Sequence, residues 1–397
     1  MKVLNGIRML DLTHMLSGPY AGMVLADLGV ETIKIEPPAR GEMTRRLLAN
    51  DPRNSHNGMG AYFLTLNRNK KSVTLDLKSD EGRQLFYKLV KSADIVLNNF
   101  SAGVTKRLQI DHDTLSKHNP RIVTCTISGY GETGPDTKRP AFDLAAQAMG
   151  GGMSITGQRN SPPTRAGIPI ADLGGGMMGV IGILSALLGR HQTGRGQHVD
   201  VSMLDVQTSM LNYMATMHLL SGEVPGRIGS GHFVHIPYDT FPASDGHIVV
   251  AVVTDASWGS LMQLLDAPDL DTEENRGQPG RWDNQHVINR RLSELFQTQP
   301  QAYWVEQLAL ARVPCAPVNN LAQAFAEPQT QARDMIVEVV HSQGGMVKMP
   351  GNPIKLSAHS DSYNSPPLLG EHTDSVLRTL AGLDIEEIGR LREQGII

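Results

Sequence analysis

The sequence predicts an α/β protein whose larger domain is a mostly parallel sheet with helices on both faces. Segments typical of strands and of helices alternate through the first half of the chain. The length of 397 residues exceeds one ordinary core. A Gly- and Pro-containing break at residues 222–231 precedes a second group of strands and helices. We expect a large domain over 1–221, a smaller α/β domain over 222–330, and a segment 331–397 that returns to the first.

The first strand–helix–strand unit begins the chain and sets the pattern. It comprises a strand at Ile7–Leu12, a turn at Leu16 and Ser17, a helix at Pro19–Leu28 and a strand at Thr32–Glu36. The pattern continues with a strand at Ser72–Leu77, a helix at Asp80–Lys91, and strands at Ile95–Asn98 and Arg121–Ile127. This order predicts a Rossmann-like sheet. No GxGxxG motif follows the first strand, so a dinucleotide site of the usual kind is not indicated.

The second half of the chain repeats these element types. A strand at Val199–Ser202 precedes a Met-rich helix predicted over Leu204–Leu220, whose methionines are typical of core filling. The smaller domain contains a strand at His247–Val253 and helices at Ala256–Leu265, Asn284–Thr298 and Ala302–Ala311.

Asp172 is the leading candidate for a reactive group. It lies between a Pro-rich turn and the apolar helix Leu173–Gly189. One interpretation is a structural N-cap, which contributes about 1 kcal/mol. The other is a nucleophile kept ionised by the free N–H groups of the first turn. The run Gly174–Gly176 predicts that another segment or a ligand approaches the helix backbone closely.

Composition and charge exclude several classes of protein. Lys and Arg (36) nearly balance Asp and Glu (40), so the sequence does not indicate a nucleic-acid surface. The two cysteines favour a reducing compartment over a disulfide scaffold, and the charged N-terminus does not resemble a signal peptide. The run Leu173–Gly189 is shorter than a spanning helix, so we expect a buried core helix. A cytoplasmic protein without a membrane partner is expected.

Eight segments, in order along nearly the whole chain, resemble the class III CoA-transferases, the CaiB/BaiF-type family of formyl-CoA:oxalate and carnitine CoA-transferases. They are DLTHMLSGPYAGMVLADLGVETIKIEPP, LNRNKKSVTLDLK, ADIVLNNFSAG, SGYGETGP, the Asp172 segment, TGRGQHVDVSMLD, VPCAPVNN and PPLLGEHT. The likeness is greatest to the acetyl- or succinyl-CoA:(di)carboxylate branch. It implies an interlocked homodimer that moves CoA from an acyl-CoA to a small carboxylic acid, with CoA thioesters as substrates and no metal or permanently bound cofactor.

The resemblance also implies roles for individual residues. Asp172 is the nucleophile, which forms aspartyl anhydride and aspartyl-CoA thioester intermediates, and Asp143 is its supporting partner. Gly229 and Gly231 belong to a glycine-rich loop over the acyl site. Apart from the resemblance, His232, His235 and Arg165 are candidates for binding the substrate carboxylate, and the alternative for each histidine is a structural residue. The residues implied in CoA binding are Leu16, Ser17, Leu66, Asn67, Arg68, Asn69, Asn99, Phe100, Arg107, Lys138 and Arg139.

Several alternatives stay open at this point. Pro37 and Pro38 stand where formyl-CoA transferases carry an arginine, so we expect Arg40 to take that contact or the contact to be missing. The glycine-rich loop is otherwise an interdomain linker, and Arg107 and Lys138 are otherwise solvated charges. A related racemase branch uses a histidine where this chain has Phe142, which disfavours proton exchange. A non-catalytic CoA-binding protein of the same fold is the remaining alternative.

Overall fold

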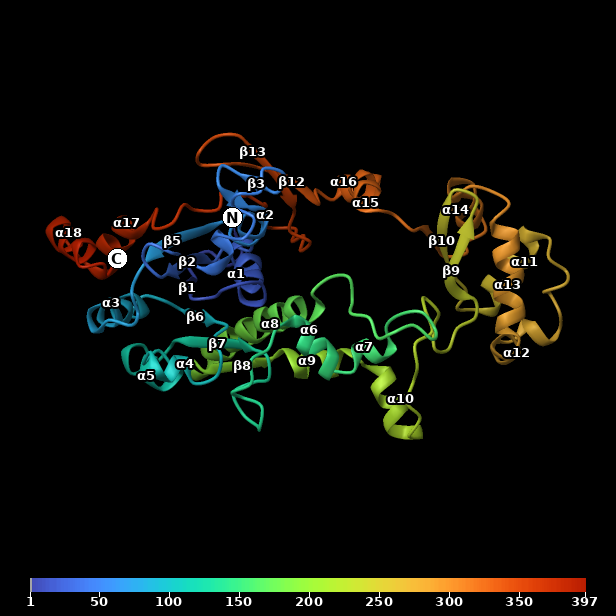
Figure 1. The fold of residues 1–397 in the computed structure, drawn as a ribbon, viewed down its shortest axis with the longest axis horizontal. Coiled ribbons are helices and arrows are strands. Elements are labelled where there is room, and N and C mark those ends of the chain that lie inside the picture. Colours follow the sequence, from blue (N-terminus) through green and yellow to red (C-terminus); the bar gives the residue numbers. More distant parts are fainter. Residues whose placement is uncertain (1) are drawn as a thin grey trace. The chain divides into compact units, whose positions relative to one another are not determined.

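The computed structural model describes residues 2–397, and the chain divides into two compact units (Figure 1). The large unit comprises Met1–Gly152, Arg165–Leu220 and Gln331–Ile397, and the small unit comprises Met153–Thr164 and Ser221–Thr330. Residues 153–164 group with the small unit, whereas the sequence prediction assigned them to the large domain.

The large unit is built on a six-stranded parallel sheet, which confirms the predicted α/β fold class. Its strand order is β5-β2-β1-β6-β7-β8. From the central strand β1, the chain first adds β2 and β5 on one side and then β6, β7 and β8 on the other. The strands are β1 Arg8–Asp11, β2 Glu31–Glu36, β5 Lys70–Thr74, β6 Ile95–Asn98, β7 Val123–Ser128 and β8 His198–Ser202.

Helices cover both faces of this sheet. On one face, α3 (Asp80–Val90) and α5 (His112–His118) share a core with α17 (Thr373–Ala381) and α18 (Ile385–Glu393). On the other face, α1 (Ser17–Asp27) and α8 (Ile170–Thr193) pack on the sheet together with α9 (Met203–Met210). Because α17 and α18 contribute Val376, Leu377, Ile388 and Leu391 to the first core, the C-terminal segment is part of the large unit.

The glycine run of α8 marks its closest contact with α1. A Cβ atom on Gly176 would lie 2.7 Å from the backbone oxygen of Ser17 and 2.9 Å from the Tyr20 ring. The two helices can therefore cross at this distance only with glycine at 176. The helix is also long and apolar enough to cross a membrane, although half of its most apolar stretch is buried. Core helices of soluble proteins share that composition.

The Met-rich segment after β8 differs from the prediction of one continuous helix. It forms α9 and then α10 (Tyr213–Ser221), with Asn212 between them in the left-handed region at φ +49°. Asparagine adopts this conformation more readily than most residues, so it permits the break.

The small unit contains a three-stranded antiparallel sheet in the order β11-β10-β9. Its core is formed by residues such as Phe241, Trp258 and Phe296, from the sheet and the helices beside it. The strands are β9 Tyr238–Ala243, β10 Gly246–Ala251 and β11 Cys315–Pro317, and the helices α11 Asp255–Leu265, η2 Glu274–Arg276, α12 Gln278–Asp283, α13 Gln285–Phe296 and α14 Gln301–Leu310.

Shorter elements complete the chain. They are η1 Met43–Arg45, β3 Ser55–His56, β4 Met59–Gly60, α2 Ala61–Leu66, α4 Val104–Arg107, α6 Asp143–Met149, α7 Gly152–Ile155, α15 Leu321–Ala326, α16 Pro328–Ala332, β12 Ile336–Val340 and β13 Met346–Pro350.

Candidate active site

A cavity of about 400 Å³ opens at the carboxyl ends of β1, β6 and β7 in the large unit. Strands β1 and β6 are neighbours in the sheet although the chain leaves β1 toward β2, so the cavity lies at the point where the strand order reverses. Parallel α/β sheets bind ligands at such points. The lining residues include His14, Met15, Ser17, Met43, Tyr62, Asn99, Phe100, Ser128, Tyr130, Arg139, Phe142, Asp172 and Met203.

Asp172 lines this cavity as the third residue of α8. The N-cap position belongs to Pro169, and no side chain of the N-cap residue caps the helix. The interpretation of Asp172 as a structural N-cap is therefore wrong. The capping contacts come from Asp143 instead, whose Oδ1 accepts hydrogen bonds from the backbone N–H groups of Ala171 (2.9 Å) and Asp172 (3.3 Å).

The electrostatic environment of Asp172 differs from the expectation that the helix start keeps its pKa low. Burial and then the Asp143 charge raise the pKa of Asp172 to about 6, while a hydrogen bond from Ser17 acts in the opposite direction. At pH 7 the carboxylate form then exceeds the acid by about tenfold. Its raised basicity makes it a stronger nucleophile than an ordinary surface aspartate.

Asp143 is held rigidly beside the start of α8. Its carboxylate is buried and accepts a hydrogen bond of 2.7 Å from Gln147 Nε2 on the next turn of α6. Gln147 Oε1 in turn accepts from the backbone N–H of Ala166, four residues before α8 begins. These contacts fix the chain that enters α8, and so fix the direction of Asp172.

Of the residues expected to bind CoA, Ser17, Asn99, Phe100 and Arg139 line this cavity, and Leu16 directly precedes Ser17. Leu16 precedes α1 as its N-cap residue, and Ser17 is the first residue of α1 and lines the cavity. Asn99 and Phe100 follow β6 and also line it. The Asn99 amide bonds both backbone groups of His14, at 2.8 and 2.6 Å, and thereby ties the loop after β1 to the loop after β6.

Tyr62 and His14 line the cavity and were not singled out from the sequence. Burial and the charge of Asp172 raise the pKa of Tyr62, so the phenol stays a hydrogen-bond donor near the carboxylate. Burial and the Lys34 ammonium lower the pKa of His14, which favours the neutral ring. A pocket-facing tyrosine carries no sequence signal distinct from that of a core tyrosine, which is why Tyr62 was missed.

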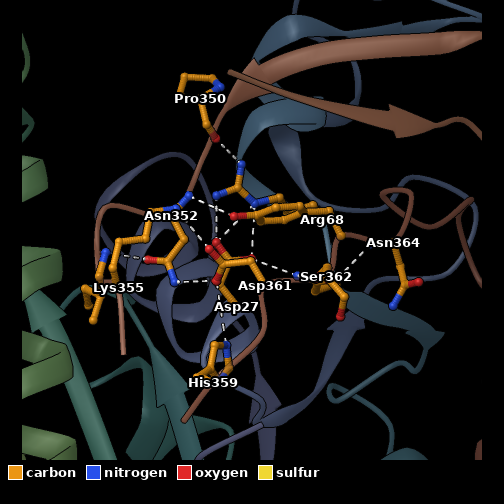
Figure 2. A network of polar contacts seen from close by, with 12 residues as sticks. Asp27, Arg68, Pro350, Asn352, Lys355, His359, Asp361, Ser362 and Asn364 are labelled. Carbon is orange, nitrogen blue, oxygen red and sulfur yellow. Dashed lines mark hydrogen bonds and ion pairs between the residues drawn. The ribbon is translucent and has the colours of Figure 1, made fainter. Parts of the chain in front are cut away.

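The loop Leu66–Asn69, which was expected to bind CoA, does not line this cavity. Figure 2 shows its buried contacts with the C-terminal segment. The Arg68 guanidinium pairs with Asp27 at 2.6 Å, bonds the backbone oxygen of Pro350, and is only 1% exposed. Asn69 bonds Asp27 and Ser362, while Leu66 and Asn67 are buried. These donors are already used within the protein.

The remaining basic candidates differ in position. Arg139 lines the cavity, with its guanidinium 5.6 Å from the centre of the Tyr130 ring. Arg40, Arg107, Lys138 and Arg165 are exposed and lie outside the cavity lining.

The glycine-rich loop lies in the small unit, before β9. Gly229 has φ +74°, and a Cβ atom there would lie 2.9 Å from Gln158 Oε1. Gly231, by contrast, is not in the left-handed region. His232 Nδ1 accepts from the backbone N–H groups of Val234 and His235, which leaves Nε2 as the proton-bearing nitrogen. The rings of His232 and His235 are 4.8 Å apart.

Within residues 2–397, no group of three or more His, Cys, Asp or Glu side chains is arranged to hold a metal ion.

Comparison with known proteins gives concordant matches. The sequence profile of CoA-transferase family III matches residues 4–373. The acetyl-CoA:oxalate CoA-transferase of Acetobacter aceti is 37% identical over 384 residues, covering 95% of each chain. The succinyl-CoA:mesaconate CoA-transferase of Haloarcula marismortui is 38% identical and covers 97% of this chain and 98% of that protein. A crystal structure of a CAIB/BAIF family protein from Brucella suis matches with a TM-score of 0.84 at 34% identity, over 96% of this chain and 99% of that one.

Proposed function

The chain belongs to CoA-transferase family III, and we propose that it moves CoA from succinyl-CoA or acetyl-CoA to a small carboxylate, a dicarboxylate in particular. The observation that carries the proposal is the half-buried Asp172 carboxylate, with a pKa near 6, at the wall of the cavity. The names of the relatives support the substrate class, because oxalate and mesaconate are both dicarboxylates.

In the proposed reaction, an Asp172 oxygen attacks the thioester carbonyl carbon of the donor. The C–S bond breaks, CoA leaves as a thiolate, and an aspartyl anhydride remains. The thiolate then attacks the aspartyl carbonyl carbon, which releases the donor carboxylate and leaves an aspartyl-CoA thioester. The acceptor carboxylate attacks this thioester and displaces the thiolate. The thiolate finally attacks the acceptor carbonyl of the second anhydride, which gives the new acyl-CoA and restores Asp172.

The residues expected to act have the following roles in this scheme. Asp143 holds the start of α8, and Ser17 donates a hydrogen bond that orients the attacking carboxylate. Asn99 and Phe100 provide the wall for the CoA arm, and Arg139 provides positive charge for a phosphate. Arg40, Arg107 and Lys138 are exposed cations outside the cavity. They can therefore contact only the phosphate-bearing part of CoA that extends beyond the cavity. Gly229, Gly231, His232, His235 and Arg165 are proposed to act on the acyl group and the acceptor acid.

Proton exchange is the less favoured candidate. Phe142 stands at the position of the second base of the racemase branch, lines the cavity, and has no titratable group.

The test is to incubate the protein with succinyl-CoA or acetyl-CoA alone and to treat it with hydroxylamine or borohydride. An adduct on Asp172 in peptide mass spectrometry, absent from Asp172→Ala, is the expected result. Screening donor and acceptor pairs then identifies the acid. CoA binding without any transfer or adduct would favour the non-catalytic alternative.

We also propose that the protein forms a homodimer and that it is cytoplasmic. Exposed apolar side chains on α8 (Met177, Ile181, Leu188) and α10 (Leu219, Leu220) support a subunit interface on these helices. Light scattering is expected to give twice the chain mass at micromolar concentration. A stable folded monomer would contradict the dimer.

A further inference from the structure

A chain of polar side chains crosses the sheet face opposite α8 and ends at the cavity loop. It consists of His112, Thr124, His198 and Glu132, and we call these four residues the polar chain. The Thr124 hydroxyl lies 3.0 Å from His112 Nδ1 and 2.8 Å from His198 Nδ1, and His198 Nε2 lies 2.9 Å from Glu132 Oε2. Thr124 and His198 are directly paired neighbours on β7 and β8, so their side chains lie on one face of the sheet.

Glu132 belongs to the loop that forms one wall of the cavity. Residues 129–142 join β7 to α6, and the lining residues on either side of Glu132 include Tyr130 before it and Arg139 and Phe142 after it. The side chain of Glu132 itself points to the sheet and is not part of the lining. A role for Glu132 at the cavity must therefore act through the position of this loop.

Three contacts converge on Glu132. In addition to His198, its backbone N–H donates to Asp200 Oδ2 at 3.0 Å, and its carboxylate receives a hydrogen bond from Thr126. Gly131 and Gly134, on either side of this part of the loop, have φ +80° and +93°, a conformation that glycine adopts without strain. Glu132 is thus an internal fixed point between the end of β7 and the start of α6.

The hydrogen bonds of the polar chain can be satisfied whichever histidine carries the extra proton. With His198 neutral, its Nε2–H donates to Glu132, the Thr124 hydroxyl donates to His198 Nδ1, and His112 Nδ1–H donates to Thr124. With His198 protonated, its Nδ1–H donates to Thr124, whose hydroxyl then turns to His112. In both arrangements Nε2–H remains directed at Glu132, so the contact that holds the loop is retained.

We propose that Glu132 and His198 are positioning residues for acyl-CoA binding, because they hold the 129–142 loop as the cavity wall against which the CoA arm lies. The inference rests on the proposed function of the cavity. Asp172 and Ser17 are held by α8 and α1, to which the hydrogen bonds of the polar chain do not extend. The positioning effect is therefore expected in substrate binding rather than in the chemical steps.

The experiment compares Glu132→Ala and Glu132→Gln in the full-length protein. We expect Glu132→Ala to raise both the Kd for CoA and the KM for acyl-CoA at least about tenfold, with kcat within about threefold of wild type. Glutamine keeps an acceptor oxygen for His198, so Glu132→Gln is expected to restore Kd and KM to within about threefold. Thr124→Val, which removes the hydroxyl but leaves the Glu132–His198 contact, is expected to have an intermediate effect.

Glu31→Ala is the matched control. Glu31 is a half-buried carboxylate on β2 that pairs with Arg8 at 2.7 Å and with Lys71 at 2.6 Å. In the strand order of the sheet, β2 is separated from β8 by β1, β6 and β7. It is expected to lower thermal stability as Glu132→Ala does, but to leave Kd and KM unchanged. Hydrogen exchange provides a second readout, with amides of 133–141 exchanging faster in Glu132→Ala only.

The outcomes are distinguishable. A Glu132→Ala protein that binds CoA as tightly as wild type and shows unchanged exchange in 133–141 would overturn the positioning role and leave the proposed function intact. Equal changes of KM in Glu31→Ala and Glu132→Ala would also overturn it, because a general loss of stability would explain both. A wild-type protein that binds no CoA would contradict the proposed function, and this inference with it.

Discussion

The Asp143 side chain, from α6, contacts the first turn of α8 beside Asp172, with Asp143 Oδ1 3.3 Å from the backbone nitrogen of Asp172. One carboxylate thus caps the helix that carries the other. The same proximity places two negative charges near each other, and this contributes to the raised pKa of Asp172. The capping contact and the basicity of the proposed nucleophile therefore have a common structural origin.

The first prediction concerns the pH dependence of the reaction. Asp172 must be ionised to attack, so kcat/KM is expected to fall as the pH decreases through about 6. Asp143→Asn removes a charge but keeps an oxygen that can accept the two N–H bonds. It is expected to shift the apparent pKa downward, because burial alone then raises the pKa of Asp172. An unchanged pH profile in Asp143→Asn would contradict a charge effect of Asp143.

The second prediction follows from the same pKa through linkage. An acid whose pKa rises from 3.8 to about 6 on folding binds more protons in the folded state between these values, so its charge lowers stability as pH rises through this window. Asp172→Asn is expected to abolish transfer and to raise the free energy of unfolding by up to about 3 kcal/mol at pH 7.5. At pH 3.5 no gain is expected. Denaturant unfolding at both pH values measures the difference, and a gain of equal size at both would rule out the charge as its cause.

The sequence predicted the parallel sheet and the position of Asp172 because both depend on local patterns. Strand ends and helix starts can be located from periodicity, and in a parallel sheet the carboxyl ends meet at one edge, which brought Ser17, Asn99 and Asp172 together. The pKa of Asp172 could not be predicted, since it depends on Asp143 and on burial, and both are tertiary features.

Arg68 illustrates the opposite case. An arginine in a loop after a helix is a typical candidate for binding phosphate. The partners of Arg68, however, are Asp27 and Pro350, which are 41 and 282 residues away in the sequence. No local pattern distinguishes a solvated guanidinium from one that is buried by a returning C-terminal segment. Tyr62 was missed for the same reason, because its contact with the cavity is made only in the folded chain.

The third prediction tests whether Arg68 stabilises the fold or binds CoA. Arg68→Met leaves Asp27 as a buried charge without its principal partner, and is expected to cost about 3–5 kcal/mol of unfolding free energy. The double variant Asp27→Asn/Arg68→Met removes both charges and is expected to recover much of that loss. CoA affinity of the folded protein should be unchanged in the double variant. A large loss of CoA affinity in a stable double variant would return Arg68 to the binding site.

The last prediction distinguishes a functional loop from a linker at Gly229 and Gly231. Alanine at Gly229 would need a left-handed backbone at φ +74° and would place Cβ 2.9 Å from Gln158 Oε1, whereas Gly231 has no such conformation. If the loop acts over the acyl group, Gly229→Ala is expected to lower kcat at least about tenfold, which is about 1.4 kcal/mol in the barrier. Gly231→Ala, the matched control, is expected to stay within about threefold, since its Cβ would only press against the Ile228 backbone oxygen at 3.2 Å. Steady-state kinetics and thermal melting of both variants provide the measurement. A Gly229→Ala protein with lowered melting temperature but full turnover would show that the positive φ serves folding alone, and the segment would then be a linker.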